Sequence, residues 1–137
     1  MPNVVSLLKQ DHRTVEKLFA QFEDSGDEAV AEEICNELDV HADAEEAVVY
    51  PAVREELSGG VRMAEHGEKE HAEARQLIGR IRQTKDPEHL KEVVSELKSA
   101  IEEHVDDEEN DVFPKMESEM GGARLDELGA EVEAAKG

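Results

Sequence analysis

Hydrophobic residues recur at helical spacing in four long stretches of the chain, and turn-forming residues separate the stretches. Apolar positions three or four residues apart form one face of an α-helix. Glycine, proline and short polar residues interrupt the pattern at positions 24–27, 58–60, 85–87 and 121–122. The pattern therefore predicts four amphipathic helices, over about residues 3–22, 28–57, 61–84 and 88–120, and a shorter amphipathic helix over 124–135.

These helices define the expected fold. Connections of only a few residues favour antiparallel neighbours. We therefore expect an all-α protein, an up-down-up-down four-helix bundle with a short C-terminal helix. We assign residues 1–120 to the bundle domain and residues 121–137 to a tail or short helix.

Composition and charge narrow the classes of partner. The 137 residues suffice for one domain, and their net charge is −21. Nucleic acids and anionic membranes are bound through clusters of Lys and Arg, so we expect neither as a partner. Cys35 is the only cysteine, which excludes an intramolecular disulfide and a multi-cysteine metal site. The chain shows no signal sequence and no apolar run long enough to span a membrane, so we expect a cytoplasmic protein.

Polar residues interrupt the hydrophobic stripes at similar depths in all four predicted helices. Isolated histidines and carboxylates facing a helical core are costly unless they are paired or bind a metal ion. The residues concerned are His12, His41, Glu45, His71, His104 and Glu108.

An internal repeat strengthens this observation. Residues 41–51, HADAEEAVVYP, align without gaps on residues 104–114, HVDDEENDVFP, and six of the eleven positions are identical. More weakly, Asp11-His12 and the apolar residues that follow align on Glu70-His71. The chain therefore resembles two helical hairpins, each with one His on its first helix and His-x-x-x-Glu on its second.

The spacing of the repeated motif suits metal binding. Residues i and i+4 lie on one face of a helix, so a His and the Glu after it can bind the same ion or adjacent ions. In a regular helix Glu45 and Glu108 face inward more than Glu46 and Glu109, although a π-bulge could exchange them. Nitrogen and oxygen ligands without sulfur favour Fe, Mn or Zn. Glu70, Asp43 and Asp106 are candidates for orienting the histidines.

The paired segments HxxxEExxVYP and HxxxEExxVFP, with the first-helix residues DHRTVEKLF, resemble the signature of hemerythrin-like domains, also called HHE cation-binding domains. The resemblance covers residues 3–120. It implies two non-haem iron ions, bridged by carboxylates and, when oxidised, by an oxo or hydroxo group. Carried over by position, it implies as ligands His12, His41, Glu45, His71, His104 and Glu108.

Two further residues are candidates for the same site. Oxygen-carrying hemerythrins have two histidines on helix three at i,i+4, whereas His66 and His71 are five apart, so His66 needs a helix bulge to join the metal ligands or else a supporting role. Tyr50, which aligns with Phe113, is either a core residue or a catalytic phenol near the metal ions.

The resemblance implies small ligands, namely O2, hydrogen peroxide or nitric oxide. Our first expectation is an enzyme that decomposes peroxide or carries out peroxidase-like oxidation. One alternative is a non-catalytic module that binds oxygen or senses iron or oxygen. Another is a structural helical bundle that holds zinc or an adventitious metal.

Overall fold

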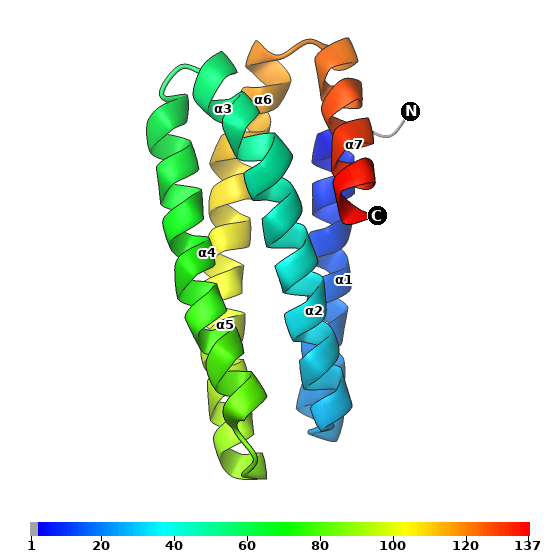
Figure 1. The fold of residues 1–137 in the computed structure, drawn as a ribbon, viewed down its shortest axis with the longest axis vertical. Helices are drawn as coiled ribbons and strands as arrows, with labels where there is room; N and C mark the ends of the chain where they lie inside the picture. Colours follow the sequence, from blue (N-terminus) through cyan, green and yellow to red (C-terminus); the bar gives the residue numbers. More distant parts are fainter. Residues whose placement is uncertain (1–2) are drawn as a thin grey trace.

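In the computed structural model, which describes residues 3–137, four long helical segments run alternately up and down, as Figure 1 shows. The all-α fold class and the four-helix arrangement expected from the sequence are therefore confirmed. In chain order the elements are α1 (Val4–Ser25), α2 (Glu28–Ala44), the π-helix η1 (Glu45–Val49), α3 (Tyr50–Glu56), α4 (Gly60–Gln83), α5 (Pro87–Asp107), the π-helix η2 (Glu108–Val112), α6 (Phe113–Glu119) and α7 (Gly122–Lys136).

Side-chain caps define where three of the long segments begin. Asn3, Asp27 and Asp86 each accept a hydrogen bond from a backbone N–H in the first turn of α1, α2 and α5. Gly26 ends α1 with a φ of 63°, a left-handed conformation that glycine adopts at little cost. These short turns hold α1 against α2 and α4 against α5 as two hairpins.

A π-helical turn interrupts the second and the fourth long segment. The backbone N–H that follows each turn donates to the carbonyl of Glu45 or Glu108, five residues earlier. Pro51 and Pro114 come two residues after each turn, and proline has no N–H to continue a regular helix. The two turns therefore follow from the repeated motif, and each begins at the first glutamate of that motif, Glu45 or Glu108.

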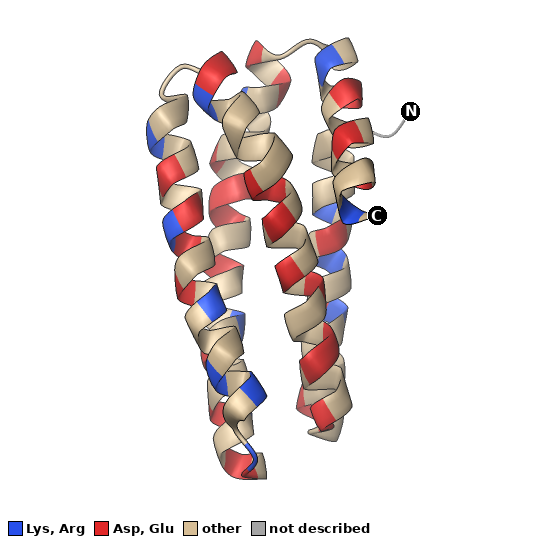
Figure 2. Ribbon diagram, viewed as in Figure 1, with Lys and Arg blue, Asp and Glu red and all other residues tan. Residues whose placement is uncertain are grey.

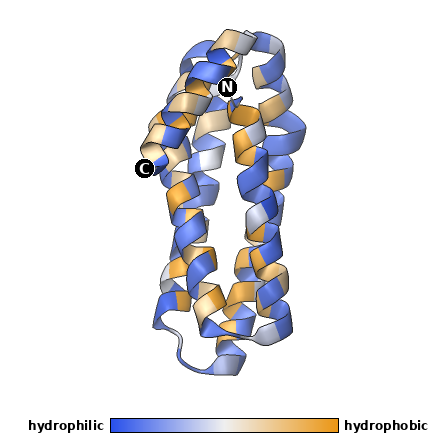
Figure 3. Ribbon diagram, turned by 90° about the vertical axis from the view of Figure 1, so that its right-hand side faces the viewer, coloured by the Kyte–Doolittle hydropathy of each residue, from blue (hydrophilic) through white to orange (hydrophobic). Residues whose placement is uncertain are grey.

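The hydrophobic core is divided into two clusters. One, near the α3 and α6 end of the bundle, includes Leu8, Tyr50 and Phe113. The other, towards the α1–α2 and α4–α5 turns, includes Phe19 and Leu97. Hydrophobic and hydrophilic positions alternate along the helices (Figure 3). The buried polar residues lie between the two clusters, in the middle of the bundle.

Helix α7 packs on the bundle. Its residues Leu125, Leu128 and Val132 are buried in the core cluster at the α3 and α6 end. In Figure 1 it lies beside α1. The domain boundary at residue 120 stays a prediction, but the apolar face of α7 shares the core of the bundle.

Acidic residues are distributed over all the long helices, as Figure 2 shows. They account for the net charge of −21. Within residues 3–137, no helix has both the length and the apolar character needed to cross a bilayer.

Candidate metal centre

Six polar side chains converge in the middle of the bundle, and every long helical segment contributes to them. The histidines come from α1, α2, α4 and α5, and the glutamates are the first residues of η1 and η2. All six are buried, with at most 6% of any residue exposed. They are the six stripe residues of the sequence, His12, His41, Glu45, His71, His104 and Glu108.

These side chains form two groups of three, each able to hold one metal ion. One group joins the α1–α2 hairpin to η2, and the other joins the α4–α5 hairpin to η1. Each group thus takes two histidines from one hairpin and its carboxylate from the other. Within a group, the ligand atoms lie within 4.8 Å of one another; the groups are His12, His41, Glu108 and Glu45, His71, His104.

Glu108 lies between the two groups. Its Oε1 is 3.1 Å from Nε2 of His12, and its Oε2 is 3.3 Å from Nε2 of His104. The hydroxyl of Tyr50 donates a hydrogen bond to Oε2 over 2.9 Å. One carboxylate thus faces a histidine of each hairpin, an arrangement that suits a bridging ligand.

Glu45 occupies the corresponding place in the other half. Its Oε1 is 3.1 Å from Nε2 of His41 and 3.0 Å from Nε2 of His71. The contact between Nε2 of His41 and Oε1 does not have hydrogen-bond geometry, so Nε2 of His41, like Oε2 of Glu45, is buried without a hydrogen-bond partner among the described residues. Buried polar atoms without partners are costly, and a cation between them would satisfy both. The donor set therefore fits a pair of metal ions.

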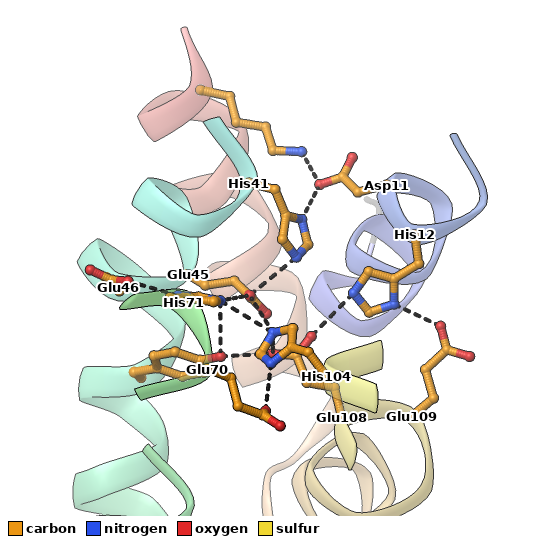
Figure 4. Close-up of polar contacts among 12 residues, drawn as sticks. Asp11, His12, His41, Glu45, Glu46, Glu70, His71, His104, Glu108 and Glu109 are labelled. Carbon is orange, nitrogen blue, oxygen red and sulfur yellow. Dashed lines mark hydrogen bonds and ion pairs between the residues drawn. The ribbon is translucent and has the colours of Figure 1, made fainter. Parts of the chain in front are cut away.

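An outer carboxylate binds Nδ1 of each histidine, so that Nε2 points inward (Figure 4). Such bonds fix the ring orientation and the tautomer of metal-binding histidines. Each histidine is already set with its inner nitrogen directed at the centre. The pairs are His12 with Glu109 at 2.7 Å, His41 with Asp11 at 2.8 Å, His71 with Glu46 at 2.7 Å and His104 with Glu70 at 2.7 Å.

Among these outer carboxylates, only Glu70 was expected from the sequence to orient a histidine. Of the other residues expected to do so, Asp43 binds Arg75 instead, at 2.9 Å, and Asp106 is exposed. Glu46 and Glu109 occupy identical positions in the repeat, and Asp11 aligns with Glu70. The repeat therefore marked these carboxylates as equivalent positions. It did not show which histidine each one binds, because the histidine lies on a different helix.

Electrostatics in the centre favour positive charge. Burial alone would lower the pKa of His41, but Glu45 and Asp11 raise it to about 10. Burial also opposes the charge of His104, yet Glu108 raises its pKa well above its usual range. Burial would raise the pKa of Glu45, whereas the neighbouring histidines, His41 foremost, hold it well below its usual range. The field of the carboxylates therefore attracts cations.

Tyr50 reaches the same centre from the start of α3. Its ring stacks on that of His71, with centroids 5.3 Å apart. Burial and the charges of Glu45 and Glu108 raise the pKa of the phenol well above its usual range. Tyr50 therefore stays protonated and acts as a hydrogen-bond donor beside the metal centre. Its repeat partner Phe113 stacks on His12 in the other half, at 5.8 Å.

The structure does not bring His66 to the buried centre. Its side chain is 58% exposed, and its Nε2 lies 3.1 Å from Asp107 and 3.4 Å from Glu70. In the regular helix α4, five residues separate it from His71, which turns the two side chains away from each other. His66 instead belongs to a separate surface group.

A small cavity of about 30 Å³ opens on the buried centre. The four histidines contribute to its lining, and most of the other lining residues are aliphatic. A cavity of this size holds a water-sized or diatomic molecule. The aliphatic residues are Val15, Leu38, Ala42, Ala74, Ile78, Ile101 and Val105.

Comparison with known proteins agrees with this geometry. The family model described as the hemerythrin HHE cation binding domain matches residues 3–115. The crystal structure of a hemerythrin HHE cation binding domain-containing protein from Mycobacterium kansasii is similar, with a TM-score of 0.85 and 24% identity over 99% of this chain and 86% of that one. A curated protein of Nostoc sp. named DNA nickase is 27% identical over 98% of this chain, which spans 39% of its length. The chain belongs to the hemerythrin HHE cation-binding domain family.

Proposed function

We propose that this chain binds two non-haem iron ions and acts on hydrogen peroxide, in peroxide decomposition or a peroxidase-like reaction. The observation that carries the proposal is the pair of buried groups, each with two histidines and one carboxylate, in which atoms of His41 and Glu45 lack hydrogen-bond partners. Six donors in two groups support two ions, and a nitrogen and oxygen set without sulfur supports iron.

An iron pair bound there would exchange electrons with the oxidant, since such redox chemistry belongs to the metal. The residues of the chain supply the surroundings. Outer carboxylates hold each imidazole with Nε2 inward, and the aliphatic wall of the cavity limits the entry of water. The Tyr50 hydroxyl holds a proton next to Glu108. Because its pKa is raised, the phenol keeps this proton and offers a hydrogen bond, which can stabilise negative charge that develops on oxygen when an O–O bond breaks; this supports peroxide as the substrate.

A non-catalytic module that binds or senses oxygen is the second candidate. The cavity beside the histidines is small and mostly apolar, which suits O2 as well as it suits peroxide. Nitric oxide has a similar size. Reversible binding of these ligands breaks no O–O bond, and this difference separates the two functions.

The DNA nickase activity of the Nostoc protein is not carried over to this chain. The chain spans 39% of that protein, and its own net charge is −21. Phosphate contacts require clustered basic residues. The similarity to the mycobacterial protein shows a shared fold, and we infer no activity from it.

The decisive experiment combines iron analysis, an absorption spectrum and an oxygen electrode on the purified protein. About two irons per chain, and oxygen release on adding peroxide, would support the enzyme. Two irons without peroxide turnover, but with reversible spectral change under O2, would favour the binding module. Absence of iron after anaerobic reconstitution would overturn the di-iron proposal. His41→Ala tests the centre, and His89→Ala is its matched surface control.

A further inference from the structure

One of the four outer carboxylates differs from the other three. Arg13, Arg75 and Lys136 each form an ion pair with the carboxylate that binds one histidine of the centre: Glu109 at 2.7 Å, Glu46 at 2.7 Å and Asp11, respectively. Among residues 3–137, Glu70 forms no ion pair with a lysine or an arginine. The centre therefore has a fixed positive charge behind three histidines but not behind His104.

Glu70 faces a different set of groups. Nε2 of His66, one turn earlier on α4, lies 3.4 Å from its Oε2. Asp107, at the end of α5, places Oδ2 3.1 Å from the same imidazole nitrogen. The three donor atoms all lie within 4.8 Å of one another. They lie at the surface, because the side chains of His66 and Asp107 are 58% and 44% exposed, whereas that of Glu70 is 11% exposed.

Two carboxylates that converge without a lysine or arginine repel each other, and a cation between them relieves the repulsion. We propose that His66, Glu70 and Asp107 form an outer site for one divalent cation, separate from the buried centre. One imidazole and two carboxylates suit Fe²⁺, Zn²⁺ or Mn²⁺. Water completes the coordination on the exposed side, so the ion exchanges readily with the solvent.

The outer site is connected to the buried centre through a single side chain. Oε1 of Glu70 accepts the hydrogen bond from Nδ1 of His104 over 2.7 Å, while Oε2 faces the outer site. A cation there occupies the place that a lysine or an arginine holds behind the other outer carboxylates. The outer site depends on neither the identity nor the presence of metal in the buried centre.

The test is a Mn²⁺ titration of the purified protein, after the metal content of the buried centre has been measured. Electron paramagnetic resonance measures the free Mn²⁺. We expect about one additional Mn²⁺ per chain, and binding at least about tenfold weaker in His66→Ala and in Asp107→Asn. The matched control is His89→Ala, which removes an exposed histidine near only one carboxylate, Glu92, at 3.6 Å. It should bind Mn²⁺ as the unaltered protein does.

Equal Mn²⁺ binding by the unaltered protein and both variants would overturn the proposal, as would an equal loss in the His89 control. A fourth variant, His41→Ala, separates this question from the proposed function. It impairs the buried centre, but it should retain the additional Mn²⁺, and circular dichroism checks that every variant is folded.

Discussion

At the scale of single residues, the two halves of the bundle differ at Tyr50, which has Phe113 as its repeat partner. The hydroxyl of Tyr50 lies where Gly67 leaves room on α4, because a Cβ at Gly67 would be 2.5 Å from the phenol oxygen. In the alignment of Glu70-His71 on Asp11-His12, Gly67 corresponds to Leu8, and Tyr50 corresponds to Phe113. The glycine and the hydroxyl therefore form a matched pair that only one half of the bundle contains.

Gly67→Ala should displace the Tyr50 ring. We expect the free energy of unfolding to fall by about 1–3 kcal/mol, since the added methyl group overpacks a buried site. Gly79→Ala on the same helix is the matched control, because a Cβ there meets nothing within 4 Å. It should raise the free energy of unfolding by about 0.5–1 kcal/mol. Urea unfolding measures the free energy of unfolding of both variants. Equal effects would contradict the close fit between Gly67 and the Tyr50 hydroxyl.

Tyr50→Phe removes the hydroxyl that donates a hydrogen bond to Glu108 and keeps the ring that stacks on His71. We expect the free energy of unfolding to fall by only about 1 kcal/mol, the usual net contribution of one hydrogen bond. Peroxide turnover should fall about a hundredfold at unchanged iron content, because the hydrogen bond that stabilises negative charge on oxygen is lost. The measurement is turnover per bound iron. Unchanged turnover would assign Tyr50 a packing role.

At the scale of secondary structure, each π-helical turn lets the repeated motif bury both its first glutamate and the two residues before its proline. A regular helix up to Glu45 or Glu108 keeps each glutamate one turn after its histidine, on the inner face. Each π-helical turn adds one residue to its helix. This residue lies after the His and Glu of the motif and before its proline. As a result, Val49 and Tyr50 are both buried beside the centre.

Helix α7 contributes to stability through its apolar face. Leu128 is 1% exposed, in the same cluster as Tyr50 and Phe113. Leu128→Ala should lower the free energy of unfolding by about 2–5 kcal/mol. Glu133→Ala, an exposed position on α7, should change it by less than about 0.5 kcal/mol. A similar value for both variants in thermal or urea unfolding would show that α7 is a detachable tail.

Helical periodicity and the repeat were sufficient to predict the bundle and the six inward residues. Each His and Glu replaces an apolar residue in a regular stripe, which local spacing reveals. The outer shell was less predictable, because Glu109 meets His12, and Glu46 meets His71, across helices far apart in the sequence. The position of His66 depends on whether α4 contains a bulge, and no local signal decided that.

At the scale of the whole molecule, the two groups of candidate metal ligands connect the two hairpins. Each group combines two histidines of one hairpin with a glutamate of the other. A bound ion therefore resists separation of the hairpins, and it stabilises the folded state by mass action.

Removing the metal should lower the melting temperature while the helices persist at room temperature. With free metal at a hundred to a thousand times its dissociation constant, the loss is about 3–4 kcal/mol. Calorimetry with and without a chelator measures it, and circular dichroism follows helicity. His41→Ala should show a much smaller chelator effect than His89→Ala. A chelator effect equal in both variants would place the stabilising ion outside the buried centre.

The exchange of glutamates between hairpins also bears on how the protein is made. His12 and Glu108 are 96 positions apart, and the other group is complete only when His104 has been added. A nascent chain that has released only its first hairpin carries two histidines of one group and the carboxylate of the other. It therefore holds neither complete group, and the first complete group of three can assemble only after translation has passed residue 104.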